Sequence, residues 1–473
     1  MRLSSATLPR IFGSVVKPRY DRNAQRCGIV HIGLGAFHRA HQAVYTDDAM
    51  NDGDCDWGIV GVSLRGAAVE AQMGPQDGLY TVRERQDNES HIRLIGAVRR
   101  ILVAPQDPGA VVRAIAEPDT KIVTCTITET GYCRGRDGRL DSALPDLASD
   151  LAADTPPKTI YGLLGRALSQ RKNSGSPGLT LICCDNLADN GGQMAALLGE
   201  FIRATGPELL AWVDDHCRCP STMVDRIVPA TTDADREQTA RDIGLRDEAT
   251  INTEPFRQWV IEDSFAGPRP RWEIGGAQFV HDVAPFETAK LRMLNGAHSA
   301  LAYLGLARRY EFVHQAIADP TIRSLIEHLM RQEAAPSLQP AAGLDLDAYA
   351  DSLLARFANK SLQHRLAQIA MDGSQKIPQR WLETLQIQNK KGQDCPALLQ
   401  ALAAWIVFLR AEVAQIGDPM APTLMALWRQ QGTLGIVDAL VGPSGIFARH
   451  WSASPEIRQR LTKMMTSFFM NAT

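Results

Sequence analysis

The chain has 473 residues, 45% of them hydrophobic and 22% charged, which is typical of a soluble globular protein with two domains. Its 50 basic and 53 acidic residues give a formal net charge of −3 without a long block of either sign. This pattern disfavours binding to nucleic acid or to an anionic membrane.

The longest apolar run, 397–409, is shorter than the roughly 20 residues that a membrane-spanning helix needs, so it predicts a buried helix. Residues 1–22 mix charges and prolines with apolar residues and lack the continuous apolar core of a secretory signal. We therefore expect a cytoplasmic protein.

Nine cysteines are an odd number, and their spacing suggests neither a disulfide framework nor a zinc site. Cys183 and Cys184 are adjacent in a predicted strand, and Cys217 and Cys219 lack a second pair at zinc-finger spacing. We expect reduced structural thiols and no metal.

The first half of the chain alternates short β-branched runs with helical stretches, the pattern of a parallel sheet covered by helices. The predicted strands are nearly continuous in hydrophobicity, as expected when both of their faces are covered, and comprise 28–32, 57–63, 121–126 and 179–184. Helices are predicted over 109–115 and 159–171. The sequence thus predicts a doubly wound α/β domain of Rossmann type.

After residue 284, apolar residues recur at spacings of three and four, which predicts a mostly α-helical second domain. The clearest predicted helices are 321–332, 347–358, 397–414 and 454–470. We therefore expect a dinucleotide-binding domain over 1–284 and a helical substrate-binding domain over 285–473. Residues 290–298 lie near this junction, and ligands usually bind in crevices between domains.

The stretch CGIVHIGLGAFHRAHQ, residues 27–42, places two glycines between a predicted strand and a predicted helix. This is half of the G-x-G-x-x-G fingerprint of dinucleotide sites, because His38 stands where the third glycine is expected. The glycine pair alone is weak and could form only a turn. The expected cofactor contacts are Ile32, Gly33, Gly35, Ala36, Phe37 and Arg39, where Arg39 either faces the phosphates or is a solvated helix residue.

The strand that ends at Ser63 is followed by Leu64 and Arg65, without the acidic residue that usually binds the cofactor ribose. Arg65 is suited to a 2′-phosphate or is a surface loop residue, so spacing alone leaves NADP open. Thr128 and Glu129 follow the third predicted strand, and Asn186 follows the fourth. The carboxyl ends of the strands in an open α/β sheet are where ligands bind.

The stretch KLRMLNGAHS, 290–299, sets polar residues among apolar and small ones. On an α-helix, Lys290, Asn295 and His298 project over an arc of about 140°. One interpretation is a partly solvated lysine, a capping asparagine and a satisfied core histidine. The other is a catalytic wall, with Glu287, three residues before Lys290, helping to relay a proton.

Oxidation of a secondary alcohol requires a neutral base within hydrogen-bond reach of the hydroxyl. A lysine can serve only if burial lowers its pKa from ~10.4 towards roughly 7 to 8. Amide donors stabilise the developing negative charge without competing for the proton, and Asn186 and Asn295 are the candidates. No metal-ligand set is visible, which argues against a zinc alcohol dehydrogenase.

The sequence resembles the long-chain polyol dehydrogenases, the mannitol dehydrogenase family. The resemblance covers most of the chain in the stretches GLGAFHRAHQ, TITETGY, CCDNLADNG, MVDRIVPAT, EPFRQWVIED and KLRMLNGAHS. It implies NAD as cofactor, no metal, Lys290 as general base, Asn186 and Asn295 as the oxyanion pair, and His298 as a substrate-orienting residue. It also implies that Glu287 lies on a proton path and that Asp225 lies near the site, although Asp225 could instead form a salt bridge with Arg226 or another basic residue.

Within the family, 364–382 resembles the corresponding segment of D-mannonate oxidoreductases, also called fructuronate reductases. Lys376 and Arg380 are then expected to bind the substrate carboxylate, unless Lys376 simply caps a helix. The expected reaction interconverts D-mannonate and D-fructuronate. The alternatives are a mannitol 2-dehydrogenase, a D-arabinitol dehydrogenase or a non-catalytic NAD-binding sugar sensor. The expected partner is a small sugar acid or polyol, and we expect a monomer or a small homo-oligomer.

Overall fold

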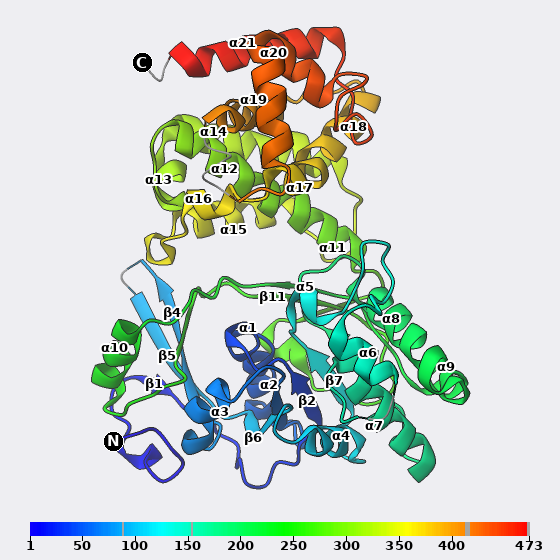
Figure 1. Cartoon of the computed structure of the whole chain (residues 1–473). Helices are drawn as coiled ribbons and strands as arrows, with labels where there is room; N and C mark the ends of the chain where they lie inside the picture. The colour runs from blue at the N-terminus through cyan, green and yellow to red at the C-terminus, as the bar shows by residue number, and fades with distance from the viewer. Residues whose placement is uncertain (88, 153–154, 412–416, 471–473) are drawn as a thin grey trace. The chain divides into compact units, whose positions relative to one another are not determined.

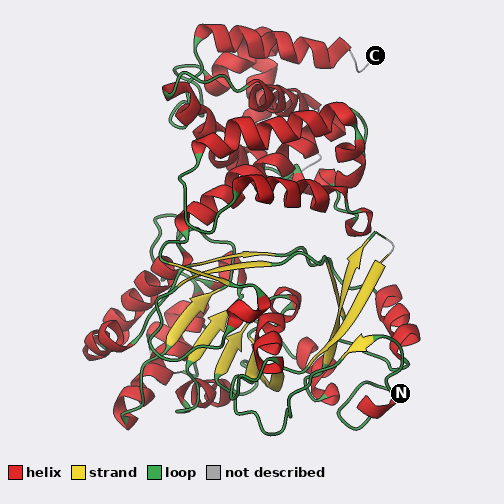
Figure 2. Cartoon of the chain, turned by 180° about the vertical axis from the view of Figure 1, so that it is seen from behind, coloured by secondary structure: helices red, strands yellow, loops and turns green. Residues whose placement is uncertain are grey.

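The computed structural model describes residues 1–87, 89–152, 155–411 and 417–470. They form two compact units, Met1–Ala284 and Pro285–Thr473 (Figure 1). Among the described residues, every strand belongs to the first unit, and the second unit consists of helices and loops (Figure 2). The predicted fold class, a Rossmann-type domain followed by a mostly helical one, is confirmed.

The core of the first unit is a five-stranded parallel sheet. Its strands, in spatial order, are β6 (Val98–Val103), β3 (Ile59–Ser63), β2 (Ile29–Ile32), β7 (Ile122–Cys125) and β8 (Thr180–Cys183). Numbered along the chain, this order is 3-2-1-4-5, which is that of a dinucleotide-binding sheet. The strand order reverses between β2 and β7, so the switch point lies at their carboxyl ends.

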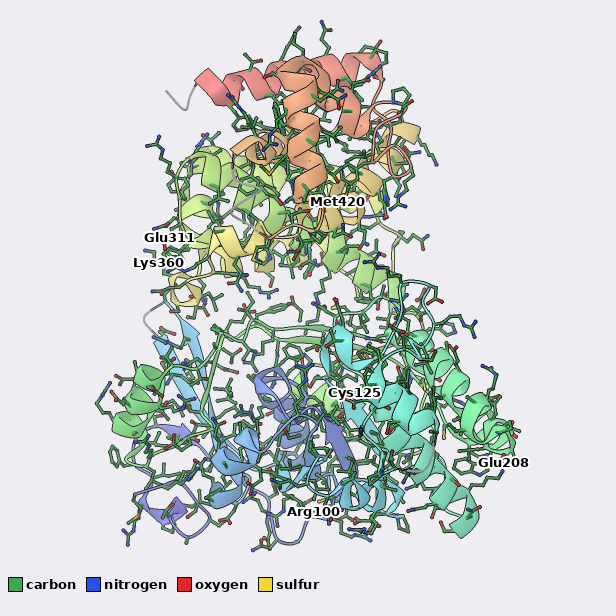
Figure 3. All side chains as sticks on the ribbon, viewed as in Figure 1. Arg100, Cys125, Glu208, Glu311, Lys360 and Met420 are labelled. Carbon is green, nitrogen blue, oxygen red and sulfur yellow. The ribbon has the colours of Figure 1, made fainter. Side chains whose placement is uncertain are left out.

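Both faces of this sheet are buried, as the continuous apolar strands predict. Val30 and Ile32 pack into a core with α4 (Pro108–Ala116), α7 (Ile160–Ser174) and α8 (Asn190–Thr205). Ile29 points to the opposite face, where the core includes residues of α2 (Gln42–Asn51). Cys125, labelled in Figure 3, ends β7 inside the first of these cores. All nine cysteines are free thiols.

Local sequence explains where these helices begin and end. Asp107 accepts a hydrogen bond from the Ala110 N–H, and Pro108 occupies the first turn, where its missing N–H costs nothing. Thr159 caps α7 in the same way, and Gly175, with φ of +69°, ends it. The helices predicted over 109–115 and 159–171 therefore correspond to α4 and α7.

Two smaller sheets complete the first unit, and none of their strands was among those predicted from the sequence. One runs β1-β5-β4-β10 and is built on the antiparallel pair β4 (Tyr80–Gln86) and β5 (Glu89–Ile95), with β1 (Val15–Val16) and β10 (Ile251–Thr253) at its edges. The other runs β12-β11-β9, with β12 (Gln278–Val280), β11 (Gln258–Glu262) and β9 (Thr222–Asp225). The shorter helices are α1 (Ala36–Ala40), α3 (Ala68–Met73), α5 (Thr128–Gly131), α6 (Pro145–Leu151), α9 (Leu210–His216) and α10 (Asp233–Ile243).

The second unit packs its helices around one apolar core that includes the fully buried Trp381, Trp405 and Trp451. Helix α19 (Pro396–Ala411) is largely buried, as the apolar run predicts, and residues 412–414 of that prediction lie outside the described residues. The remaining helices are α11 (Ala284–Ala289), α12 (Gly296–Ala307), α13 (Val313–Ala318), α14 (Pro320–His328), α15 (Leu346–Ala358), α16 (Leu366–Ile369), α17 (Gly373–Ile377), α18 (Glu383–Lys390), α20 (Ala421–Val441) and α21 (Pro455–Met470).

Three segments of this unit are π-helical: Lys290–Asn295, Leu329–Ala334 and Pro378–Leu382. The first joins α11 to α12, and the other two pack against it. A π-helix bonds each N–H to the carbonyl five residues earlier; it is rare and frequently occurs at functional sites. Sequence periodicity predicts a helix here but not this wider turn.

None of the helices within the described ranges is long and apolar enough to cross a bilayer.

Candidate active site

The glycine turn lies at the switch point of the parallel sheet. Gly33 follows β2 with φ of +100°, and its N–H donates to the Val62 carbonyl oxygen of β3 at 2.8 Å. A Cβ on Gly33 would lie 2.0 Å from the Thr126 carbonyl oxygen, so no larger residue fits. A Cβ on Gly35 would approach only the Gly33 carbonyl oxygen, at 3.7 Å. The exposed backbone of Gly35 therefore borders open space, which suits close approach by a cofactor pyrophosphate.

The residues after this turn form the short helix α1. Ile32, the last residue of β2, is fully buried, Ala36 begins the helix, and the Phe37 ring stacks on His41 with centroids 4.9 Å apart. Arg39 is buried, and its Nη1 donates to the Ala249 carbonyl oxygen at 2.6 Å. Arg39 is therefore not a solvated helix residue, and its contact with the cofactor phosphates stays a prediction.

The other predicted cofactor residues lie at the carboxyl ends of neighbouring strands. The Ser63 hydroxyl at the end of β3 donates to the Gly66 carbonyl oxygen at 2.6 Å. Arg65 is exposed, and its guanidinium donates to the Thr130 hydroxyl at 3.2 Å. Thr128, with φ of +63°, and the exposed Glu129 begin α5 after β7. The structure thus gathers these residues along one edge of the sheet.

Asp185, which follows β8, accepts the hydrogen bonds that hold this edge of the sheet together. It was not among the predicted site residues. Its carboxylate accepts hydrogen bonds from the Ile127 N–H at 2.8 Å and the Thr128 N–H at 3.2 Å. The Tyr132 hydroxyl also donates to it, at 2.7 Å. Asp185 therefore fixes the left-handed backbone of Thr128, and Asn186 follows it at an exposed position.

Asp225 ends β9 and is only 7% exposed. The Arg226 guanidinium, the partner considered for it, is instead bound to the Glu84 carboxylate at 2.5 Å. Arg226 also donates to the Glu254 carbonyl oxygen, which uses up most of its donors. Asp225 and Asn186 both belong to the first unit, whereas the lysine constellation belongs to the second.

The lysine constellation lies on one continuous helix. Lys290 begins the π-helical segment and is 6% exposed, while Asn295 ends the segment and is partly buried. At its end the Gly296 N–H donates to the Leu291 carbonyl oxygen, five residues back. The two polar residues are therefore about one π-turn apart. The predicted arc of about 140° assumed the 3.6 residues per turn of an α-helix. The π-helical segment has more residues per turn, so the angle between Lys290 and Asn295 around the helix axis is smaller. Glu287, in α11, is partly buried one helical turn earlier.

His298 lies in basic and aromatic surroundings. Its ring centroid is 4.7 Å from that of Phe357 and 5.4 Å from that of His364. Burial lowers the pKa of His298 well below its usual value, and the neighbouring His364, Arg356 and Arg380 lower it further. The imidazole is therefore neutral and can both donate and accept a hydrogen bond. Sequence reasoning singled out neither His364 nor Arg356.

Arg380 is held directly against the end of the π-helical segment and the start of α12. Its Nη1 donates to the Ser299 hydroxyl at 2.8 Å and to the Asn295 carbonyl oxygen at 3.3 Å. Burial lowers the pKa of Arg380 to about 10, and within the described ranges no carboxylate forms an ion pair with it. Arg380 is half-buried, and a partly desolvated guanidinium without a carboxylate partner is suited to receive an anion.

Lys376 lies one helical turn before Arg380. Its ammonium donates to the Met371 carbonyl oxygen at 2.6 Å and is 3.9 Å from the Asp372 carboxylate. Burial lowers the pKa of Lys376, and the charge of Arg380 lowers it further. The Lys376 ammonium therefore lies near a carboxylate, whereas no carboxylate among the described residues forms an ion pair with Arg380.

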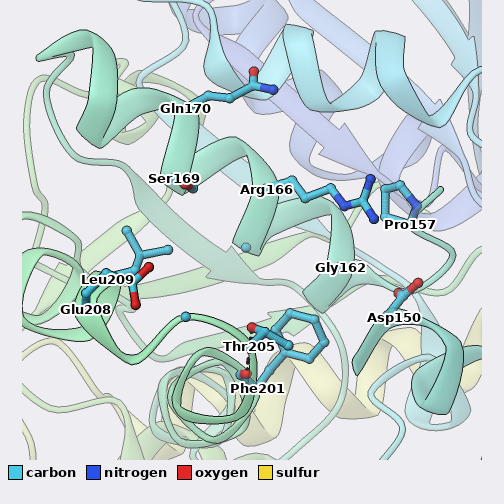
Figure 4. A pocket seen from close by; sticks show the side chains of 12 residues that line it. Asp150, Pro157, Gly162, Arg166, Ser169, Gln170, Phe201, Thr205, Glu208 and Leu209 are labelled. Carbon is cyan, nitrogen blue, oxygen red and sulfur yellow. Dashed lines mark hydrogen bonds between the residues drawn. The ribbon is translucent and has the colours of Figure 1, made fainter. Parts of the chain in front are cut away.

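A separate pocket of about 350 Å³ lies between α7 and α8 (Figure 4). Phe201 and Thr205 line it on one side, and Arg166 and Ser169 on the other. It contains none of the predicted site residues. In the part of the chain that the structure describes, no group of three or more His, Cys, Asp or Glu side chains is placed to hold a metal ion.

Comparison with known proteins agrees with this arrangement. Residues 27–274 match the family model of the mannitol dehydrogenase Rossmann domain, and residues 282–468 match that of the mannitol dehydrogenase C-terminal domain. The chain is 41% identical over 445 residues to D-mannonate oxidoreductase of Escherichia coli (strain K12), covering 92% of this chain and 91% of the relative. It is 38% identical to mannitol 2-dehydrogenase of Phaeosphaeria nodorum over 90% of this chain and 77% of that one.

Solved structures give the same picture. A ternary complex of Pseudomonas fluorescens mannitol 2-dehydrogenase with NAD and D-mannitol is similar with a TM-score of 0.82 at 36% identity, over 100% of this chain and 98% of that one. A substrate-free D-sorbitol dehydrogenase is similar with a TM-score of 0.92 at 31% identity, over 100% and 99% of the two chains. The predicted family is thereby confirmed, and the chain belongs to the mannitol dehydrogenase family.

Proposed function

We propose that this chain is an NAD-dependent oxidoreductase that interconverts D-mannonate and D-fructuronate, with Lys290 as the general base. It is a dehydrogenase of the polyol and aldonate class, as its family and the NAD-bound relative indicate.

The first unit fits NAD. The glycine turn, the open space beside Gly35 and the edge formed by Ser63, Arg65 and Thr128 all lie around the switch point of the sheet. When bound, NAD accepts the hydride that leaves the alcohol carbon. We assign the backbone of 32–37 to the pyrophosphate, and the strand ends to the remainder of the dinucleotide.

The base is proposed from the burial and position of Lys290. An amine that is 6% exposed loses much of the hydration that favours its charged form, which is the condition for a neutral base. In the oxidative direction Lys290 takes the hydroxyl proton, and in reduction it returns the proton to the carbonyl oxygen. Glu287, one turn earlier on the same helix, is assigned to relay that proton to solvent.

The oxyanion is assigned to amide donors. Asn295 lies about one π-turn after Lys290, so both side chains can address one substrate oxygen. Asn186, exposed at the end of β8, is the proposed second donor, and Asp225 is proposed to contact substrate hydroxyls. Neutral His298 then orients the substrate by hydrogen bonding rather than by charge.

The observation that carries the sugar-acid assignment is the guanidinium of Arg380, which no carboxylate neutralises in the part of the chain that the structure describes. A neutral polyol would leave this half-buried charge without a counter-ion, at a cost in stability. A carboxylate can instead accept two parallel N–H bonds from it, which is the strongest and most directional pairing available to arginine. Arg356 adds positive charge close to His298. Lys376 is assigned a supporting part, since its ammonium already binds the Met371 carbonyl.

The proposal is tested by comparing kcat/KM for reduction of D-fructuronate and D-fructose with NADH. We expect D-fructuronate to be preferred by at least about tenfold, the effect of one charge-assisted contact. A clear preference for fructose would instead identify a mannitol 2-dehydrogenase, the activity for which several relatives are named. D-arabinitol belongs in the same substrate panel. Tight NADH binding without turnover of any of these compounds would identify a non-catalytic sugar sensor.

A further inference from the structure

The central strand β2 carries a histidine among its apolar residues. His31 lies between Val30 and Ile32, and its side chain is fully buried. Neighbouring strands of such a sheet are nearly all apolar, since a buried polar group is costly unless hydrogen bonds satisfy it. The position of His31 therefore requires an explanation.

Both ring nitrogens of His31 find partners across the switch point. Nδ1 is 2.7 Å from the Thr124 hydroxyl on β7, while Nε2 is 3.0 Å from the Gly33 carbonyl oxygen and 3.0 Å from the Thr126 hydroxyl. The Thr126 hydroxyl also donates to the Gly33 carbonyl oxygen, at 2.8 Å. Burial lowers the pKa of His31 to about 3, so the ring is neutral. A neutral ring that carries its proton on Nε2 satisfies all of these contacts.

We propose that His31 and Thr126 are positioning residues that hold the Gly33 carbonyl and thereby fix the glycine turn for NAD. The Gly33 carbonyl oxygen also holds the turn itself together, because it accepts a hydrogen bond from the Gly35 N–H at 2.6 Å. With φ of +100° at Gly33, the backbone has the freedom that glycine gives, and the two side chains restrict it to one orientation. The inference rests on the proposed use of NAD.

His38 completes this arrangement at the position where the fingerprint has its third glycine. Its ring stacks on that of His31 with centroids 3.4 Å apart and an interplanar angle of 15°, and it is fully buried. Within the described residues neither of its ring nitrogens has a hydrogen-bond partner. His38 therefore acts by packing: its ring, on α1, stacks on the His31 ring beside the glycine turn.

The test uses matched threonine variants of the full-length enzyme. Thr126→Val removes the hydroxyl that donates to Gly33, whereas Thr120→Val removes a buried hydroxyl that donates to the Ala114 carbonyl oxygen at 2.8 Å, away from the turn. We expect Thr126→Val to raise the Kd for NADH about fivefold and Thr120→Val to leave it unchanged. Thr126→Ser keeps the hydroxyl and is expected to restore the wild-type Kd. At saturating NADH, kcat for the sugar substrate should stay within about twofold of wild type for all three variants.

Equal Kd values for Thr126→Val and Thr120→Val would overturn the inference and leave the proposed function intact. The same holds if Thr126→Ser binds NADH as weakly as Thr126→Val, since the hydroxyl would then be irrelevant. A wild-type enzyme that does not bind NADH would overturn the proposed function and this inference together. Thermal unfolding of the four proteins separates lost affinity from lost folding.

Discussion

The guanidinium of Arg380 donates a 2.8 Å hydrogen bond to the hydroxyl of Ser299, which ties a half-buried cation to α12, the helix that follows the π-helical segment beginning at Lys290. Ser299 is fully buried, so this bond fixes Arg380 near the predicted catalytic residues of the second unit. No carboxylate forms an ion pair with Arg380 among the described residues, and the proposed sugar-acid substrate rests on this observation.

Replacing Arg380 with methionine should therefore change substrate preference. We expect kcat/KM for D-fructuronate to fall about 10- to 100-fold, the value of a charge-assisted contact, while kcat/KM for D-fructose changes little. Arg429→Met, an exposed arginine of the same unit, is the matched control and should leave both values unchanged. An equal loss for the two substrates would show that Arg380 has only a structural role.

A second prediction concerns the glycine turn, where two substitutions should differ in their effects on stability and on NADH binding. Gly35→Ala should preserve the melting temperature, because its Cβ meets only the Gly33 carbonyl oxygen at 3.7 Å, yet it should weaken NADH binding by filling the space beside the backbone. Gly33→Ala should lower both, since its Cβ would collide with the Thr126 carbonyl at a positive φ. Thermal unfolding and NADH fluorescence titration measure the two effects. Unchanged NADH affinity of Gly35→Ala would place the pyrophosphate elsewhere.

Cofactor discrimination should be weak. No carboxylate follows β3 at Ser63 to Arg65, so nothing there repels a 2′-phosphate. We expect NADH to bind more tightly than NADPH, but by less than about 10-fold, and Arg65→Glu to widen that ratio by repelling the extra phosphate. Dissociation constants from fluorescence titration test this. If Arg65→Glu weakens both cofactors equally, Arg65 does not lie near the ribose.

A fourth prediction concerns a buried carboxylate in the second unit. Glu333 is 1% exposed, and its carboxylate accepts the Ala397 and Leu398 N–H groups at the start of α19, each at 2.7 Å. Burial raises the pKa of Glu333 to about 7, and the negative charge of Asp394 adds to the rise, while the two N–H bonds oppose it. The raised pKa means that the folded protein holds a proton more tightly than the unfolded chain.

The resulting contribution to stability is fully present below about pH 4.5 and is lost as the pH rises through about 7. Glu333→Gln carries no titrating group, so the stability of wild type relative to this variant should fall by roughly 1 to 3 kcal/mol between pH 5 and pH 8. Denaturant unfolding of both proteins at several pH values gives this difference. Parallel pH profiles would mean that Glu333 titrates alike in both states.

Much of this fold follows from local sequence signals. The apolar strand before Gly33 and the caps at Asp107 and Thr159 act over a few residues, and the predicted parallel sheet is confirmed. The pair β4 and β5 was missed because its strands carry charged residues, most of them toward the exposed hairpin end, instead of a continuous apolar run.

The site was harder to predict, because long-range contacts decide it. The Arg39 guanidinium binds the Ala249 carbonyl, 210 residues away, and His31 meets Thr124 and Thr126 across the sheet. Periodicity cannot reveal such partners. The sequence does not reveal the π-helical turn at Lys290 either, because the π-segment is too short for its apolar pattern to differ from that of an α-helix.

The most direct test of the account is turnover by Lys290→Ala. With D-mannonate and NAD, we expect kcat to fall by about 10² to 10⁴, the usual share of general-base catalysis, while the Kd for NADH stays at the wild-type value. Lys391→Ala, an exposed lysine of the same unit, should behave as wild type. An added small primary amine should restore part of the lost rate, because it replaces the missing base. Oxidation of mannonate by Lys290→Ala at the wild-type rate would contradict the assignment of the base.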